Sequence, residues 1–153
     1  MDAKKALNIA AGLCSKKEYC SSDILQKLER WEIPAREQAE IMAFLIKNKF
    51  IDENRFAASY ARDKFRFNKW GKQKIVQMLK QKGISPDTIA DALSELDDTD
   101  YDETCVSLLK QKMKSIKDTD PYKIKAKLYR FSLSRGFDYD TINRAISRLT
   151  EDE

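Results

Sequence analysis

Apolar residues recur at every third or fourth position along the chain, a spacing typical of amphipathic α-helices. The first helix is predicted over residues 3–14. A second follows Ser21 or Ser22, either of which can cap it, and a third takes Pro34 into its first turn. The apolar faces expected for these helices are Ala3, Ala6, Leu7, Ala10, Ala11 and Cys14, then Ile24, Leu25, Leu28 and Trp31, then Ala39, Ile41, Met42 and Leu45.

Asp52 predicts the start of another helix, because its carboxylate can accept hydrogen bonds from the free N–H groups of the first turn. Gly71 interrupts the apolar pattern before the next helix begins. That helix is expected to end at Gly83, where glycine can adopt the left-handed conformation. The apolar faces of these two helices are Phe56, Ala57, Tyr60 and Ala61, and Ile75, Met78 and Leu79.

Capping residues also predict the remaining helix starts. Ser85-Pro86, Asp120-Pro121 and Asp138 each precede an apolar pattern. The acidic run at 97–102 contains Asp100, spaced as in a capping box with Glu103, so we expect a loop that leads into a helix there. The apolar faces expected are Ile89, Ala92, Leu93 and Leu96, then Cys105, Leu108, Leu109, Met113 and Ile116, then Ile124, Leu128 and Phe131, then Ile142, Ala145, Ile146 and Leu149.

The helices repeat in groups of three. A shift of 53 positions places Gly83 on Gly136 together with the cap and apolar face that follow. A shift of 51 positions aligns an earlier group less well, with Glu32 where the glycine would be. Short apolar faces can resemble one another by chance, but cap, glycine and face repeat together. We therefore predict an all-α fold, an elongated tandem array of three three-helix, helix-turn-helix-like repeats at residues 1–50, 51–98 and 99–153.

The composition argues against catalysis. The chain has 153 residues and no histidine, which excludes Ser-His and Cys-His pairs. Cys14, Cys20 and Cys105 would need carboxylates to complete a zinc site, so we expect reduced thiols near the core and no cofactor or metal. No stretch approaches the roughly 20 apolar residues of a membrane span. We expect a cytoplasmic protein that does not bind membranes.

Charge is strongly segregated behind a net value of +4. Residues 61–83 carry eight basic residues against one acidic, residues 84–105 carry eight acidic and no basic residues, and residues 106–136 carry nine basic against two acidic. Such bands are either solvated helix faces or a surface for a polyanion. Phe65, Phe67, Trp70 and Tyr129 could stack on bases if they are exposed, whereas core packing is the favoured interpretation for Phe65 and Trp70.

Several blocks of the sequence resemble the RecX family of recombination regulators. They are Phe50-Ile51-Asp52-Glu53-Asn54-Arg55-Phe56-Ala57, Tyr60, Gly71-Lys72-x-Lys74-Ile75 and Leu79-x-x-Lys82-Gly83-Ile84. The resemblance covers most of the chain, weakens toward Met1 and includes no catalytic motif. Each matching residue also has a purely architectural interpretation, and Arg55 could be a surface ion-pair partner.

The resemblance implies a regulator without catalytic activity. Such a protein would lie in the groove of a RecA–DNA filament, bridge neighbouring subunits and hinder ATP hydrolysis, strand exchange, coprotease function and filament growth. The implied partners are the RecA recombinase filament and single- or double-stranded DNA, bound weakly and in a salt-dependent manner. We expect a monomer that acts in homologous recombination, DNA repair and the SOS response.

The basic bands supply the expected contact set for filament or DNA. The first patch is Arg62, Lys64, Arg66, Lys69, Lys72, Lys74, Lys80 and Lys82, and the second is Lys123, Lys125, Lys127 and Arg130. The alternative function is a stand-alone DNA-binding helical repeat protein, although no helix rich in Arg, Asn or Gln near its start stands out for base readout. An enzyme is a distant third.

Overall fold

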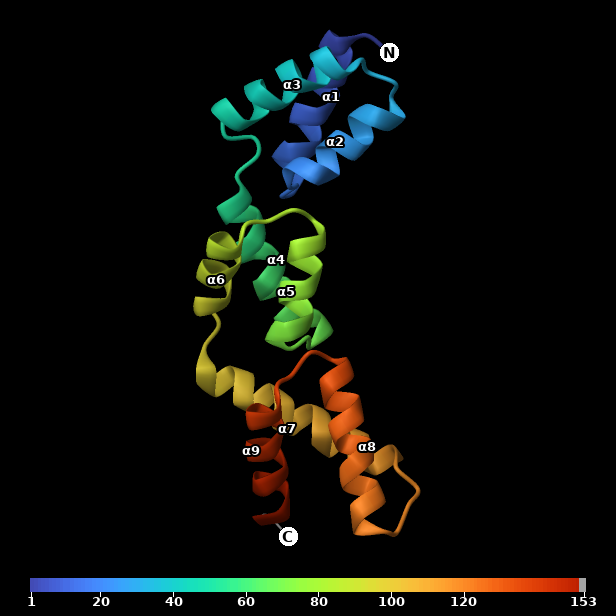
Figure 1. Ribbon diagram of the computed structural model, residues 1–153. Helices are drawn as coiled ribbons and strands as arrows, with labels where there is room; N and C mark the ends of the chain where they lie inside the picture. Colours follow the sequence, from blue (N-terminus) through green and yellow to red (C-terminus); the bar gives the residue numbers. More distant parts are fainter. Residues whose placement is uncertain (152–153) are drawn as a thin grey trace. The chain divides into compact units, whose positions relative to one another are not determined.

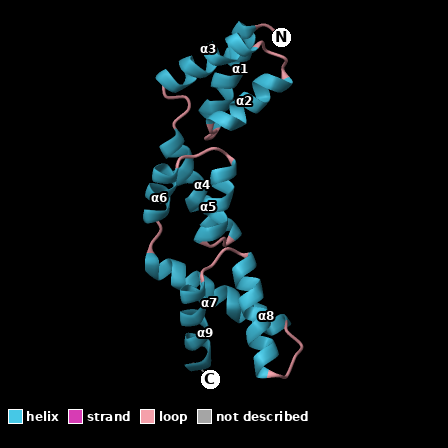
Figure 2. Ribbon diagram, in the orientation of Figure 1, coloured by secondary structure: helices cyan, strands magenta, loops and turns pink. Residues whose placement is uncertain are grey.

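The structure is a computed structural model that describes residues 1–151. These residues form nine α-helices and no strand. The helices are labelled in Figure 1, and Figure 2 colours them by secondary structure. The predicted all-α class is therefore confirmed. The helices are α1 (Ala3–Lys16), α2 (Ser21–Arg30), α3 (Ala35–Lys47), α4 (Glu53–Asn68), α5 (Lys72–Gln81), α6 (Pro86–Ser94), α7 (Asp98–Ser115), α8 (Pro121–Ser134) and α9 (Tyr139–Glu151).

The chain divides into two compact units. The first unit comprises Met1–Tyr60 together with Leu79–Asp91, and the second comprises Ala61–Met78 together with the chain from Ala92 onward. Helices α4, α5 and α6 therefore contribute residues to both units. None of the helices in residues 1–151 combines the length and apolar character that crossing a membrane requires.

The core of the first unit lies among α1, α2 and α3, and the predicted apolar faces supply most of it. Its buried residues include Ala6, Ala10, Ile24, Leu28, Ile41, Met42 and Leu45. Two predicted members were wrong. Leu25 is 40% exposed and Ala39 is also exposed, because neither lies on the side of its helix that faces the neighbouring helices.

Four of the predicted helix caps are confirmed by hydrogen bonds from the first turn. The backbone N–H groups of Arg55, Thr88, Tyr122 and Thr141 donate to the side chains of Asp52, Ser85, Asp120 and Asp138, over distances of 3.0, 3.3, 3.0 and 3.2 Å. Capping oxygens therefore specify these starts locally.

Three predicted helix starts need correction. The N-cap of α2 is Cys20, whose N–H donates to the Asp23 carboxylate over 3.4 Å, because the Ser22 hydroxyl instead donates to the carbonyl of Lys82. Pro34 is itself the N-cap of α3 and lies just before the first turn. Helix α7 begins within the acidic run, capped by Asp97, which accepts the N–H of Asp100 over 2.9 Å.

The internal repeat is visible in the backbone at three helix ends. Glu32, Gly83 and Gly136 all have positive φ, at 58°, 81° and 95°. At each place the next residue donates its N–H to the carbonyl five positions earlier, over 3.1 Å, from Ile33 to Leu28, Ile84 to Leu79 and Phe137 to Ser132. This is the Schellman arrangement that ends helices. Glu32 adopts the conformation of the two glycines, so this helix end recurs in the earlier group as well.

The core of the second unit includes Tyr101, a residue that the sequence did not lead us to expect there because it lies in an acidic run. Tyr101 is 4% exposed, and its ring lies 5.8 Å from that of Phe65 and 5.1 Å from that of Phe137, between centroids. Its hydroxyl accepts the backbone N–H of Lys72 over 2.9 Å. Helix α7 therefore already includes residue 101, whose ring packs in the core.

Candidate binding surfaces

The residues of the first predicted basic patch are divided between the two units. Six of its residues belong to the second unit, whereas Lys80 and Lys82 belong to the first. Lys80 is exposed, but the Lys82 ammonium lies 2.9 Å from the Asp23 carboxylate and 5.7 Å from the centre of the Phe56 ring. Lys82 therefore has a structural role in the first unit.

The Lys82–Asp23 pair shifts both ionisation equilibria. Partial burial acts against both charges, but the hydrogen bond and the charge of the partner outweigh it. The pKa of Asp23 is consequently lowered and the pKa of Lys82 is raised. Both groups stay ionised at neutral pH.

Several lysines of the first patch lie over aromatic rings. The ammonium groups of Lys64 and Lys74 lie 4.9 and 4.6 Å from the centre of the Trp70 ring. Lys72 lies 4.8 Å from the centre of the Tyr101 ring and 3.8 Å from the Asp98 carboxylate. Such contacts between cations and ring faces are worth about 0.5–1 kcal/mol at exposed sites. These contacts favour particular positions of the three ammonium groups beside the rings.

The aromatic residues near Trp70 differ in exposure. Phe67 is 71% exposed, whereas Phe65, Trp70 and Tyr129 are half-buried. The preference for core packing is therefore only partly met by Phe65 and Trp70. Arg55 forms the ion pair that its sequence context allowed: it lies 2.6 Å from the Glu18 carboxylate. Its guanidinium also donates to two backbone carbonyls.

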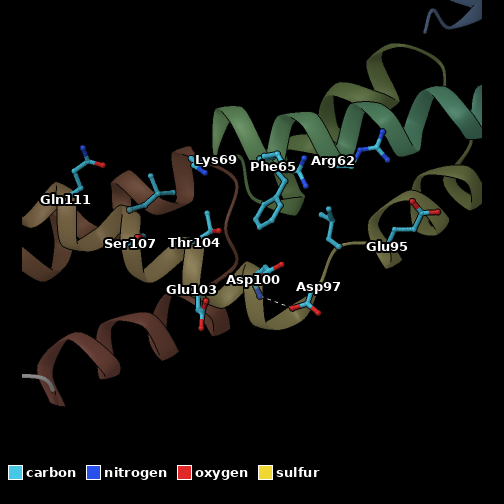
Figure 3. A pocket seen from close by; sticks show the side chains of 13 residues that line it. Arg62, Phe65, Lys69, Glu95, Asp97, Asp100, Glu103, Thr104, Ser107 and Gln111 are labelled. Atoms are coloured by element: carbon cyan, nitrogen blue, oxygen red, sulfur yellow. Dashed lines mark hydrogen bonds between the residues drawn. The ribbon is translucent and has the colours of Figure 1, made fainter. Parts of the chain in front are cut away.

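The remaining residues of the first patch line a hollow of about 550 Å³ in the second unit, which we call the mixed-charge groove. Figure 3 shows Phe65 pointing from α4 into this hollow, with Asp100 and Thr104 on α7 across from it. One side comes from α4 and the residue that follows it, and the other from the connection between α6 and α7 and from α7 itself. The lining residues are Arg62, Phe65, Arg66, Lys69, Glu95, Leu96, Asp97, Asp100, Glu103, Thr104, Ser107, Leu108 and Gln111.

A second hollow of about 690 Å³ lies between the end of α7 and α8, and we call it the basic groove. Its charged lining residues are all basic: Lys112, Lys117, Lys127 and Arg130. Phe131 also lines it, with the Lys112 ammonium 5.1 Å from the centre of its ring. Lys127 in addition lies 3.6 Å from the Asp118 carboxylate, which partly neutralises it.

The basic groove overlaps only part of the second predicted patch. Lys127 and Arg130 line it, whereas Lys123 and Lys125 are exposed on α8 outside its lining. Sequence reasoning omitted Lys112 and Lys117 from the contact set. The excess of positive charge over residues 106–136 included both, but selecting them requires knowing that the end of α7 lies beside α8.

Residues 1–151 contain no cluster of side chains suited to a metal ion. The three cysteines are buried and unpaired, and burial raises the pKa of the Cys105 thiol to about 12, which suppresses its nucleophilic thiolate form.

This combination defines a tandem three-helix repeat protein with two charged grooves in its second unit. Models of the second and third three-helix domains of RecX match residues 52–93 and 99–146. Regulatory protein RecX of Chlorobium phaeobacteroides is 32% identical over 97% of this chain and 95% of its own length. The chain belongs to the RecX family.

Other relatives extend the comparison. Regulatory protein RecX of Clostridium perfringens strain 13 is 37% identical over 72% of this chain, and the matched part spans about half (52%) of that relative's length. The crystal structure of RecX from Lactobacillus salivarius superimposes with a TM-score of 0.86, at 26% identity, over 97% of both chains. The family resemblance seen in the sequence is thereby confirmed.

Proposed function

We propose that this protein binds the filament that a RecA-type recombinase forms on DNA and restrains its activity without catalysing a reaction. Membership of a family whose relatives are named regulatory proteins carries this proposal. The filament as partner comes from the motif resemblance around Asp52, Gly71 and Gly83. We expect the protein to act as a cytoplasmic monomer.

The basic groove supports a contact with the DNA of such a filament. Lys112, Lys117 and Arg130 can neutralise phosphates and release their counterions, which makes binding dependent on salt concentration. Lys127 contributes less because Asp118 already lies beside it. The exposed Lys123 precedes Lys127 by four positions and extends the positive surface on the same face of α8, whereas the exposed Lys125 lies on another face of the helix.

The test is the single-stranded-DNA-dependent ATPase activity of the cognate recombinase, with this protein titrated onto preformed filaments at increasing salt. Inhibition at amounts well below one molecule per recombinase subunit is expected, because a regulator of growth or of several subunits acts below saturation. The charge-reversal pair Lys112→Glu and Arg130→Glu should weaken inhibition. The matched pair Lys4→Glu and Lys47→Glu alters two exposed lysines of the first unit and should leave it unchanged.

The same assay tests the alternative of a stand-alone DNA-binding protein, which the exclusively basic charge of the α7–α8 groove favours. That alternative requires bare DNA to bind with good affinity in the same tubes while the recombinase remains fully active. Such a result would remove the filament proposal.

A further inference from the structure

The mixed-charge groove carries opposite charges on its two sides. Arg62, Arg66 and Lys69 line one side, and all three are exposed. The opposite side carries the carboxylates of Glu95, Asp97, Asp100 and Glu103, which are also exposed. Within residues 1–151, none of the three basic side chains forms an ion pair with any of these carboxylates. The two sets of charges are therefore not neutralised by one another.

This arrangement selects the chemical class of the ligand. A nucleic acid strand carries negative phosphates and no positive charge, so it can pair with the basic side of the groove but is repelled by the carboxylates of the other side. A polycation would be attracted by the carboxylates but repelled by the arginines and the lysine. A protein segment that displays acidic residues along one edge and basic residues along the other matches both sides of the groove.

The apolar part of the lining fits the same kind of ligand. Phe65, Leu96 and Leu108 are half-buried and line the same hollow, Phe65 from α4 and the two leucines from the elements that carry the carboxylates. They can receive an apolar side chain of the docked segment and remove it from water. Figure 3 shows the Phe65 ring in this position.

We propose that the mixed-charge groove docks a segment of a partner protein that carries an apolar side chain between acidic and basic edges. The inference rests on the proposed function, in which the partner is a recombinase subunit of the filament. It divides the second unit into a protein-contacting groove at α4–α7 and a phosphate-contacting groove at α7–α8.

Neutralising each side separately tests this inference on the full chain. The variants are Arg62→Gln with Arg66→Gln, and Glu95→Gln with Glu103→Gln; Asp97 is kept because it caps α7. Binding is measured to recombinase filaments assembled on single-stranded DNA with a non-hydrolysable ATP analogue, and to the same bare DNA. Each variant should lose about tenfold in affinity for the filament. The acidic-side variant should bind bare DNA at least as well as the wild type.

The acidic-side variant separates a protein ligand from DNA. If the groove held DNA, removing two carboxylates would preserve or strengthen filament binding, and that result would overturn the inference. Circular dichroism and thermal unfolding of both variants should match the wild type, because all four altered side chains are exposed.

A photo-crosslinking amino acid in place of Ser107 gives a second readout that does not depend on charge. Ser107 is exposed and lines the groove. Ultraviolet light should join it to the recombinase subunit; an adduct with labelled DNA, or no adduct, would count against the inference. Filament binding that survives both charge variants would overturn the inference alone. A wild-type chain that does not bind the filament would overturn the proposed function and the inference together.

Discussion

Gly71 and Gly136 pack backbone against backbone within the second unit. The N–H of Gly71 donates to the carbonyl of Arg135 over 2.7 Å, and the N–H of Gln73 donates to the carbonyl of Gly136 over 2.9 Å. A Cβ atom on Gly71 would overlap the Gly136 carbonyl group, and one on Gly136 would overlap the Lys74 side chain and backbone. The start of α5 is therefore docked against the turn between α8 and α9, and both positions require glycine.

Replacing Gly71 by alanine should destabilise the second unit. The added methyl group has no space beside Gly136, so the backbones must separate and their hydrogen bonds must break. Overpacking of this kind costs about 1–3 kcal/mol. Gly12→Ala is the matched control, because open space surrounds that position in the exposed face of α1 and alanine favours helix there by up to about 1 kcal/mol. Urea unfolding monitored by circular dichroism measures both, and equal stability of Gly71→Ala and wild type would argue against the docked arrangement.

Glu32→Gly should stabilise the first unit. Glu32 has φ of 58°, in the left-handed region where Gly83 and Gly136 stand in the corresponding helix ends. The left-handed conformation costs a residue with a Cβ about 1–2 kcal/mol of folding free energy. Glycine avoids this cost, but it also has more conformational freedom to lose on folding, so the net gain in stability is smaller. Gly83→Ala is the reciprocal change, with no atom near the new methyl group, and should lower stability through backbone strain alone. Thermal unfolding that moved both variants in the same direction would contradict this explanation.

Local signals in the sequence predicted the presence of each helix and most of the helix starts. Caps such as Asp52 and Asp138 bond to the first turn of their own helix, so they can be recognised in the sequence without knowledge of the tertiary structure. Tyr101 was missed for the opposite reason. It lies in an acidic run whose polarity predicts a loop, and its burial depends on Phe65, Phe137 and the N–H of Lys72, all distant in sequence.

The candidate surfaces were predicted less completely than the fold. Charge counting found the basic bands, but it could not separate Lys82, which pairs with Asp23, from Arg62, which lines a groove. The charge pattern also does not distinguish Lys112 and Lys117 from neighbouring lysines, because which residues line the basic groove depends on the packing of α7 beside α8. Predicting these surfaces from the sequence would therefore require knowing which helices pack against one another.

Tyr101→Phe should destabilise the second unit while leaving its packing intact. The phenylalanine ring fills the same space between Phe65 and Phe137, but the N–H of Lys72 no longer has its acceptor. An unsatisfied partly buried N–H costs about 1–3 kcal/mol. Tyr122→Phe removes the hydroxyl of a residue that is 86% exposed and should be neutral. Calorimetric unfolding of the two variants distinguishes the missing hydrogen bond from a general effect of removing a hydroxyl group.

Stability of the first unit should depend on pH through Asp23 and Lys82. The pKa of Asp23 is lowered in the folded chain, so its stabilising effect is present above the unfolded value of about 3.9 and is lost as pH falls through the folded value. The pKa of Lys82 is raised, so its effect is present below about 10.4 and is lost as pH rises through the folded value. Asp23→Asn should cost about 1–2 kcal/mol at pH 7 and flatten the acid limb of the stability profile. If the wild type and Asp23→Asn showed the same dependence of stability on pH, including below pH 4, the pair would contribute nothing to folding.

Salt dependence should reveal whether the basic groove contacts phosphates. Replacing Lys112 and Arg130 by glutamine removes two charges that line the groove, whereas Lys47→Gln removes an exposed charge on α3 of the first unit. If both groove residues neutralise phosphates of single-stranded DNA, the slope of log affinity against log salt should become shallower by about 0.7 for each charge removed. Fluorescence anisotropy with a labelled oligonucleotide measures the slope at several salt concentrations. Because counterion release depends on the number of phosphates neutralised, a lower affinity with an unchanged slope would mean that these residues act through the fold and not by touching DNA.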